Sequence, residues 1–343
     1  YVAYRKYLKR KQHECLDISS PVSLAQVTRG KWVVAPEGNF KVTGVCTHKS
    51  LFESGHLLMA RGALDRGYLS DIVIKQLAAD EASGIVCTDP TLYLELGVPV
   101  LQVKSIRAAV LALGTAARNA FLGKVVGVTG SAGKTPTVAM LTHALSMFGS
   151  AEGTKKSANL PVGIAWNVFN MSSSSEYWVL EMAVGQMAVN TSLVKPQVAL
   201  ITNIAPAHLE YHQNTRTIAQ KKALLMEAML PSGTLVLFGA ILPKDIFLSK
   251  AKKKGLNVIT YGEGAENDIQ LVKRQGTVVQ VSWEQRSLYF DIGLKDKHMV
   301  LNALSVFATM QALKIDWLKC LSVFKTFRPL AGRGEVSELS FNG

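Results

Sequence analysis

Apolar and polar residues follow two different patterns along this chain. From residue 124 to about 261, short β-branched runs alternate with segments whose apolar residues recur at helical spacing, as in residues 138–145 and 217–229. Buried strands are predicted at residues 124–129, 177–181, 198–203, 234–238 and 257–261. This alternation predicts a mostly parallel, doubly wound α/β sheet, which binds ligands at the carboxyl ends of its strands.

The pattern changes after this region. Residues 269–292 alternate between apolar and polar with a period of two, so an antiparallel extension of the sheet is predicted. Helices are predicted at residues 300–312 and 317–327.

The first part of the chain predicts a small mixed α/β domain. Residues 1–11 form a basic helical pattern, and residues 21–103 mix short strands with helices, for example a helix at 71–79 and a strand at 84–87. An Ala- and Leu-rich helix at 105–121 then leads into the strand at 124–129. We expect an N-terminal domain at residues 1–120, a central domain at 121–330 and a hinge at 331–343.

Composition agrees with packed domains. The 343 residues suffice for two or three of them, and 48% of the residues are hydrophobic against 18% charged. The longest apolar runs fall far short of the roughly 20 residues of a membrane span, so no span is expected. The four cysteines are widely separated and no secretory signal precedes them, which favours a reducing, cytoplasmic setting.

The net charge of +13 suits anionic substrates such as nucleotides and peptidyl carboxylates. Basic clusters at residues 5–11 and 250–254 could also attract nucleic acid or anionic lipid, although solvated helix faces explain them as well. A nucleic-acid partner is not expected, because the basic residues are scattered and no aromatic platform lies among them.

The most informative motif is Gly127-Val-Thr-Gly-Ser-Ala-Gly-Lys134-Thr135, which lies between a predicted strand and a predicted helix. Such a glycine-rich turn directs backbone N–H groups at polyphosphate, so Gly130, Ser131 and Gly133 are predicted to line a nucleotide site. Lys134 would reach the terminal phosphates and Thr135 would bind Mg²⁺. A glycine-rich turn without a ligand is the alternative.

Polar residues follow three further predicted elements. Glu181 ends an apolar strand and could hold Mg²⁺ directly or through water. Asn203 ends the next strand and is followed by His208 and His212, whose spacing suggests zinc, but the usual Glu-x-x-His context and a third ligand are absent. Lys222 could meet phosphate or carboxylate, whereas Lys221 fits a solvated helix face better.

Taken together, these motifs resemble the Mur ligases of peptidoglycan synthesis. The resemblance rests on the glycine-rich motif, Val179-Leu-Glu-Met182, Ile201-Thr-Asn-Ile204, Ala207-His-Leu-Glu-Tyr-His212 and Lys222. The common phosphate-loop pattern has Gly six residues before the Lys, where this chain has Val128 and carries Gly127 one residue earlier, and that shift is typical of the family. The stretch from Val179 to His208 is most similar to the UDP-N-acetylmuramoyl-tripeptide:D-alanyl-D-alanine ligases.

The resemblance implies a role for each motif. Lys134 and Thr135 would bind ATP phosphates and Mg²⁺, and Asn203 would lie near the γ-phosphate. Glu181 and His208 would bind metal, and a carbamylated Lys222 would support a second metal ion. The family's adenine-side asparagine, its ATP-facing hinge arginine and its acceptor-facing asparagine correspond to Asn302, Arg333 and Asn159.

The implied reaction is phosphorylation of a substrate carboxylate to an acyl phosphate, followed by attack of an amine. Metal ions and a lysine can neutralise the charge that develops during phosphoryl transfer. The resemblance also implies that the amine-substrate domain, which follows Glu335 in the family, is absent from this chain.

Several positions depart from the family pattern. Ala132 and Pro136 replace the usual Asn and Thr, and residues 186–190 replace the usual Pro-Gly-Glu-Ile stretch, so another acceptor is possible. In the first 120 residues the likeness to a UDP-binding domain is faint, since Thr47-His-Lys49 stands where Asp-Ser-Arg is usual. The alternatives are a non-catalytic nucleotide-binding scaffold or sensor, and an amide ligase of the polyglutamate or cyanophycin type.

Overall fold

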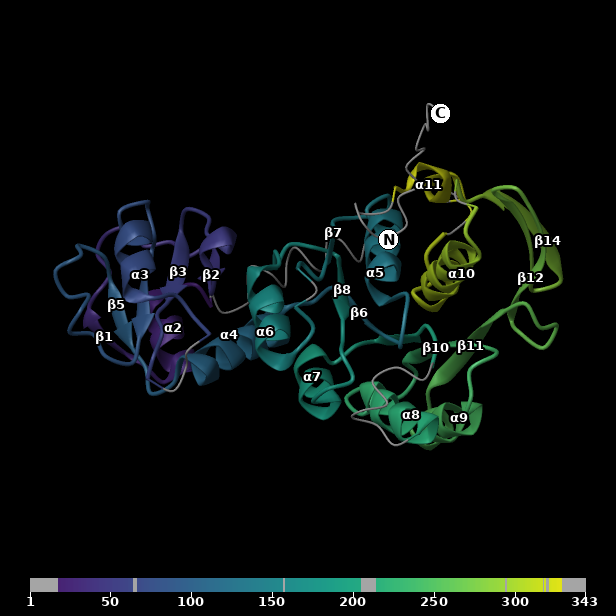
Figure 1. Cartoon of the computed structure of the whole chain (residues 1–343), viewed down its shortest axis with the longest axis horizontal. Coiled ribbons are helices and arrows are strands. Elements are labelled where there is room, and N and C mark those ends of the chain that lie inside the picture. Colours follow the sequence, from purple (N-terminus) through teal and green to yellow (C-terminus); the bar gives the residue numbers. More distant parts are fainter. Residues whose placement is uncertain are drawn as a thin grey trace, which may run out of the picture. The chain divides into compact units, whose positions relative to one another are not determined.

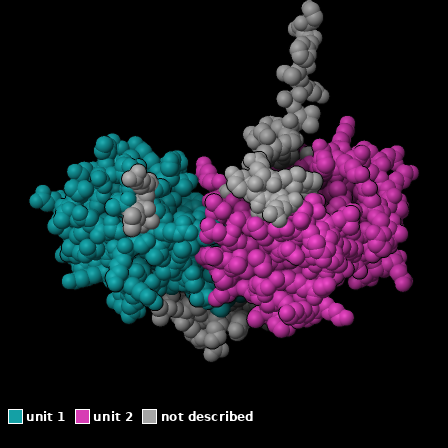
Figure 2. Space-filling model, turned by 60° about the horizontal axis from the view of Figure 1, so that its bottom comes forward, with its two compact units in different colours: residues 1–122, 161–174 teal, residues 123–160, 175–343 magenta. Residues whose placement is uncertain are grey.

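The computed structural model describes residues 18–63, 67–156, 158–204, 214–293, 295–316, 318 and 321–328 (Figure 1). The chain divides into two compact units, coloured separately in Figure 2. The first unit comprises the chain up to Leu122 together with Pro161–Ser174, and the second comprises Gly123–Leu160 and the chain from Ser175 onward.

The first unit is built on a five-stranded sheet in the order β1-β5-β4-β3-β2. β1 pairs antiparallel with β5, and the other neighbouring strands are parallel. The strands are β1 (Lys31–Val34), β2 (Gly44–Cys46), β3 (His56–Met59), β4 (Gly84–Cys87) and β5 (Val100–Gln102). The helices are α2 (Pro21–Thr28), η1 (Lys49–Leu51), α3 (Asp71–Ala78), α4 (Ile106–Ala120) and α6 (Pro161–Asn170).

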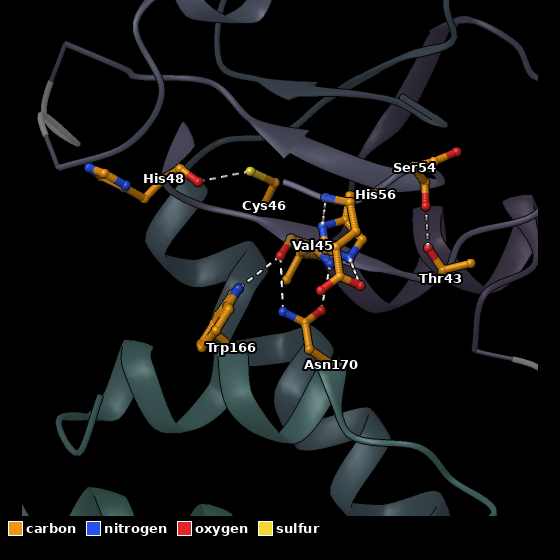
Figure 3. Close-up of polar contacts among 9 residues, drawn as sticks. Thr43, Val45, Cys46, His48, Ser54, His56, Trp166 and Asn170 are labelled. Atoms are coloured by element: carbon orange, nitrogen blue, oxygen red, sulfur yellow. Dashed lines mark hydrogen bonds and ion pairs between the residues drawn. The ribbon is translucent and has the colours of Figure 1, made fainter. Parts of the chain in front are cut away.

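Helix α6 covers the free edge of this sheet at strand β2 (Figure 3). The Asn170 side chain pairs with Val45 as a neighbouring strand would: its Oδ1 accepts from Val45 N at 2.7 Å, and its Nδ2 donates to Val45 O at 3.0 Å. The indole of Trp166 donates to the same carbonyl at 2.8 Å. An edge strand with unpaired backbone groups invites pairing with other chains, and these side chains satisfy one residue of that edge.

The second unit contains a nine-stranded sheet in the order β14-β13-β12-β11-β10-β9-β6-β8-β7. The pairs from β7 to β12 are parallel, and β13 and β14 extend the sheet antiparallel. The strands are β6 (Lys124–Thr129), β7 (Ala151–Gly153), β8 (Tyr177–Glu181), β9 (Val198–Ile201), β10 (Thr234–Phe238), β11 (Asn257–Gly262), β12 (Ile269–Gln275), β13 (Val278–Trp283) and β14 (Arg286–Asp291).

Helices cover both faces of the nine-stranded sheet. Figure 1 shows α5 and α10 on one face and α7, α8 and α9 on the other. Their bounds are α5 (Lys134–Leu145), α7 (Met187–Val194), α8 (Thr215–Ala223), η2 (Leu224–Met226), α9 (Lys244–Lys253), α10 (Lys297–Ala312) and α11 (Leu321–Thr326). Burial on both faces explains why β6, β8, β9 and β10 are continuous apolar runs in the sequence.

The predicted α/β class and doubly wound parallel sheet are confirmed, and most predicted elements lie within one or two residues of the observed ones. The predicted helix at 217–229 ends at Ala223 and continues as the 3-10 turn η2. Of the predicted helix at 317–327, the structure describes residues 318 and 321–327, in which α11 covers Leu321–Thr326. Among the described residues, no helix is long and apolar enough to cross a bilayer.

Candidate active site

The glycine-rich motif forms the turn between β6 and α5 at the carboxyl edge of the sheet. Gly133 has φ +78°, a left-handed conformation that favours glycine, and α5 begins at the next residue, Lys134. Pro136 therefore falls in the first helical turn, where the absence of its N–H breaks no helical bond. The predicted sequence of strand, glycine-rich turn and helix is confirmed.

The loop is held in place by residues that follow β9. Asn203 Oδ1 accepts hydrogen bonds from the backbone N–H groups of Ser131 at 2.9 Å and Ala132 at 2.8 Å. The hydroxyl of Thr202 donates to Ala132 O at 2.7 Å. A Cβ on Gly130 would lie 1.9 Å from Thr202 Oγ1, so only glycine allows this approach. An amide oxygen thus lies where two loop N–H groups could bind an anionic oxygen.

Two lysines meet at the first residue of the loop. The Nζ atoms of Lys134 and Lys222 donate to Gly130 O at 3.1 Å and 2.8 Å. Lys222 is only 3% exposed. Its burial, together with the positive charge of Lys134, lowers the pKa of Lys222 from 10.5 to about 7. Two amino groups thus share one acceptor.

A carboxylate lies at the start of α5. The Thr135 hydroxyl donates to Glu181 Oε2 at 2.7 Å, and Asn159 Nδ2 donates to Glu181 Oε1 at 2.8 Å. The backbone N–H of Glu181 donates to Thr154 Oγ1 at 2.7 Å. Glu181 is 3% exposed, so these contacts hold a buried carboxylate in one orientation.

The donor set suits Mg²⁺ better than a metal that needs a complete protein cage. Mg²⁺ is usually held by one or two carboxylates with substrate phosphates and water, and Thr135 and Glu181 supply a hydroxyl and a carboxylate in contact. Among the described residues, no group of three or more His, Cys, Asp and Glu side chains could hold a metal. Thr135 and Glu181 therefore fit a magnesium ion whose remaining ligands would come from substrate phosphates and water.

Asn302 lies in α10 beside the same turn. Its Oδ1 is 2.9 Å from the position that a Cβ of residue 133 would occupy. Asn302 is buried, and its Nδ2 is 3.6 Å from Met299 Sδ. The structure thus brings a second polar side chain, from the far end of the unit's sequence, to the glycine-rich loop.

The structure gathers most of the predicted site residues around this loop. Lys134, Thr135, Asn159, Glu181, Asn203, Lys222 and Asn302 all lie on or beside it, in the contacts described above. His208, His212 and Arg333 lie outside the described residues.

Sequence reasoning missed three side chains that support the site. Thr154 follows β7 and Thr202 follows β9, and their position at strand ends was the available signal. Asn190 donates to the backbone carbonyl of Asn159 at 3.3 Å. It stands on the buried stripe of α7 with Met187, Thr191 and Val194, and an amide on such a stripe is unusual.

The site can bind an anion with several oxygens. Two lysine side chains, two loop N–H groups and the start of a helix converge on the loop, and each favours negative charge nearby. The Thr135–Glu181 pair next to them can hold a cation. The fold and this site define the second unit as a phosphate-loop α/β domain.

Comparison with known families identifies the relatives of this domain. Residues 128–310 match the Mur ligase middle domain, which is more than half of the chain. The chain belongs to the Mur ligase family.

Individual relatives agree with this assignment. The chain is 28% identical to UDP-N-acetylmuramoyl-tripeptide--D-alanyl-D-alanine ligase of Synechocystis sp. over 288 residues, which cover 81% of this chain and 60% of that protein. It is 30% identical to the enzyme of the same name from Bacillus subtilis over 193 residues, or 54% of this chain and 40% of the relative. The chain thus spans less than two thirds of either curated relative.

Solved structures share the fold. MurF from Acinetobacter baumannii superposes with a TM-score of 0.80 at 22% identity, over 94% of this chain and 71% of that one. MurF ligase from Thermotoga maritima, in complex with ADP, superposes with a TM-score of 0.69 at 22% identity, over 88% of this chain and 70% of that one.

Proposed function

We propose that this chain is the ATP-binding part of an ATP-dependent carboxylate:amine ligase, which forms an amide bond on a UDP-muramoyl peptide or a related acceptor. The observation that carries the proposal is the convergence of Lys134 and Lys222 on Gly130 beside the Thr135–Glu181 pair. Family membership and the names of the curated relatives support the reaction class.

In this proposal ATP phosphates bind along the loop formed by Gly130, Ser131, Ala132 and Gly133. Their oxygens replace Asn203 Oδ1 as acceptors of the loop N–H groups, and Lys134 turns from Gly130 O to the terminal phosphates. Asn203, once displaced, remains next to the γ-phosphate. Asn302 faces the nucleotide from α10, and we assign Arg333 to the ATP site as well.

Thr135 and Glu181 would hold Mg²⁺, and we assign His208 to the metal in addition. When bound, Mg²⁺ neutralises phosphate charge during transfer to the substrate carboxylate. Asn159 fixes one oxygen of Glu181 and is assigned to the acceptor side of the site.

We also propose that Lys222 is carbamylated. In carbamylation the uncharged amine attacks CO₂ and loses a proton, and a pKa of about 7 leaves a large fraction of Lys222 uncharged at neutral pH. The product is an anion, which would relieve the repulsion between Lys222 and Lys134 and provide an oxygen ligand for a second cation.

The remaining assignments complete the proposal. Residues 1–120 would bind the nucleotide-linked substrate, residues 121–330 would bind ATP, and residues 331–343 would form a hinge to the domain that supplies the amine. We also propose a cytoplasmic location. Among the described residues Cys46 and Cys87 are free thiols, which agrees with a reducing compartment.

Calorimetric titration of ATP with Mg²⁺ tests the proposal. Lys134→Ala should weaken ATP binding about 10- to 100-fold, since hydrogen bonds to charged groups contribute about 1.5–3 kcal/mol. Lys221→Ala, which removes an exposed lysine next to Lys222, is the matched control and should bind ATP as the wild type does. UDP-muramoyl peptides are then titrated into the same sample.

Each outcome separates one alternative. ATP binding with a muramoyl-peptide signal supports the cell-wall ligase. ATP binding without that signal points to another acceptor, as in a polyglutamate- or cyanophycin-type ligase, or to a nucleotide-binding scaffold. A wild-type chain that binds no ATP would refute the enzymatic proposal.

A further inference from the structure

Asn190 is a fully buried amide in helix α7, with no exposed surface. Its Nδ2 donates to two backbone carbonyls, Asn159 O and Gly185 O, each at 3.3 Å. Its Oδ1 has no hydrogen-bond partner among the described residues. Both neighbours of Nδ2 are acceptors, so the orientation of the amide is fixed by what it contacts.

Stability alone does not account for an amide at this position. A buried amide oxygen without a partner costs about 1–3 kcal/mol, whereas an apolar side chain of similar size would incur no such cost. The neighbours of Asn190 on the buried stripe of α7 include the apolar residues Met187 and Val194. What Asn190 supplies, and leucine would not, is the pair of donors aimed at residues 159 and 185.

The donor to residue 159 acts on the segment between β7 and α6. Asn159 lies outside any helix or strand, and its carbonyl accepts from Ala183 N at 3.2 Å as well as from Asn190. These two bonds approach from the loop after β8 and from α7. Together they fix the backbone from which the Asn159 side chain extends.

That side chain holds the buried carboxylate. Asn159 Nδ2 donates to Glu181 Oε1, while Thr135 donates to Glu181 Oε2. Each carboxylate oxygen therefore has its own donor, and the plane of the carboxylate is set by both. The Thr135 donor belongs to a regular helix, but the Asn159 donor depends on a loop that Asn190 braces.

We propose that Asn190 is a positioning residue for the Mg²⁺ ligand Glu181, acting through Asn159. This inference rests on the proposed function, in which Glu181 binds the metal that accompanies the nucleotide. Residues behind a metal ligand orient it, and their loss typically weakens metal binding about 10- to 100-fold. Asn190 is one residue further from the metal, so we expect a loss of about 3- to 10-fold, at or below the lower end of that range.

The test measures how strongly Mg²⁺ promotes ADP binding to the full 343-residue chain. ADP is titrated by calorimetry in Mg²⁺ and again in EDTA. The dissociation constant in EDTA divided by that in Mg²⁺ measures how much the metal strengthens ADP binding. Asn190→Leu keeps the branched shape of the side chain, with methyl groups in place of the amide oxygen and nitrogen, and removes both donors. We expect this ratio to fall about 3- to 10-fold in the variant, with ADP affinity in EDTA unchanged.

Thr191→Val is the matched control. Thr191 is the next residue of α7, is also buried, and donates one hydrogen bond to Leu225 O at 2.7 Å rather than to Asn159 O. It should lose stability while keeping the wild-type ratio. Asn190→Ala, which adds no bulk, serves if leucine disturbs the fold.

The two proposals fail in different ways. A wild-type chain whose ADP affinity is the same in Mg²⁺ and EDTA would refute the metal site, and with it the role of Asn190. A wild-type chain with a clear Mg²⁺ effect that Asn190→Leu retains in full would refute the role of Asn190 alone. A ratio reduced equally in Thr191→Val would also overturn it, because the loss would then follow general destabilisation.

Discussion

The Nζ atom of Lys222 lies 2.8 Å from the carbonyl oxygen of Gly130, a residue 92 positions earlier in the chain. The Nζ atom of Lys134 lies 3.1 Å from the same oxygen. Burial of the Lys222 amino group, and next the positive charge of Lys134 beside it, lower the pKa of Lys222, so this lysine loses its proton more easily. This relationship gives the site a measurable pH dependence.

Lys222 should make stability rise with pH. The pKa of Lys222 is about 7 in the folded chain and has its ordinary value of 10.5 in the unfolded chain. Between these pH values the unfolded chain therefore binds more protons than the folded chain. The free energy of unfolding should therefore increase through this window, by up to about 1.4 kcal/mol per pH unit. Lys222→Met should lack that increase in urea titrations performed in CO₂-free buffer.

Lys221→Met controls for the loss of a lysine from the same helix, and its pH profile should follow the wild type. Parallel profiles for Lys222→Met and the wild type would contradict the lowered pKa.

Asn203 should compete with bound nucleotide. Its Oδ1 occupies the N–H groups of Ser131 and Ala132, so ADP must break these two bonds. Asn203→Ala should be less stable without ligand by about 1 kcal/mol, yet ADP should raise its Tm more than that of the wild type. Differential scanning fluorimetry with and without ADP measures both effects.

Asn214→Ala is a suitable comparison, because Asn214 Oδ1 caps α8 by accepting from Thr217 N at 2.9 Å. It should be destabilised to a similar extent and keep the wild-type ADP shift. An ADP shift in Asn203→Ala that is smaller than the wild-type shift would count against competition.

Gly130 and Thr202 should behave as a coupled pair. A methyl group on Gly130 would displace the Thr202 hydroxyl and break its bond to Ala132 O, so Gly130→Ala should cost about 1–3 kcal/mol. Thr202→Ala removes the clashing oxygen, and the double variant should lose less than the sum of the two single variants. Urea denaturation of all four proteins completes the cycle.

Gly67→Ala provides the control for this cycle, since a Cβ at residue 67 meets no atom within 4 Å. Strict additivity between Gly130→Ala and Thr202→Ala would mean that the two residues are not in contact.

Asn170 should stabilise the edge of the first sheet. Asn170→Ala leaves Val45 N without its side-chain acceptor, at a cost of about 1–3 kcal/mol. The matched variant Asn257→Ala loses an exposed side-chain bond to Ser232 O and should cost less than about 0.5 kcal/mol. Equal losses in urea denaturation would indicate that the pairing with β2 contributes nothing.

Much of the second unit could be predicted because its information is local. Strands β6, β8 and β10 are buried on both faces, and each appears in the sequence as an apolar run with polar residues only at its ends, and the predicted bounds match the observed ones. Helix α5 was predicted only from residue 138, because its first turn is polar and carries the site residues Lys134 and Thr135.

The site was predictable where residues follow strands. Glu181 ends β8 and Asn203 follows β9, the two parallel strands on either side of β6, so both lie at the same carboxyl edge of the sheet. Asn190 was not predictable, since it acts through two backbone carbonyls whose positions depend on tertiary packing. The pairing of Asn170 with Val45 spans 125 residues and leaves no trace in local periodicity.

That long separation affects how the protein is made. During synthesis β2 emerges from the ribosome well before α6, and at about 5–20 residues per second the delay is about 6–25 s. Throughout this interval strand β2 of the nascent first sheet has unpaired backbone groups along its free edge. A chaperone that covers exposed strand edges would protect the chain from aggregation most in this period. Truncation of the gene after residue 122 would leave this edge exposed permanently.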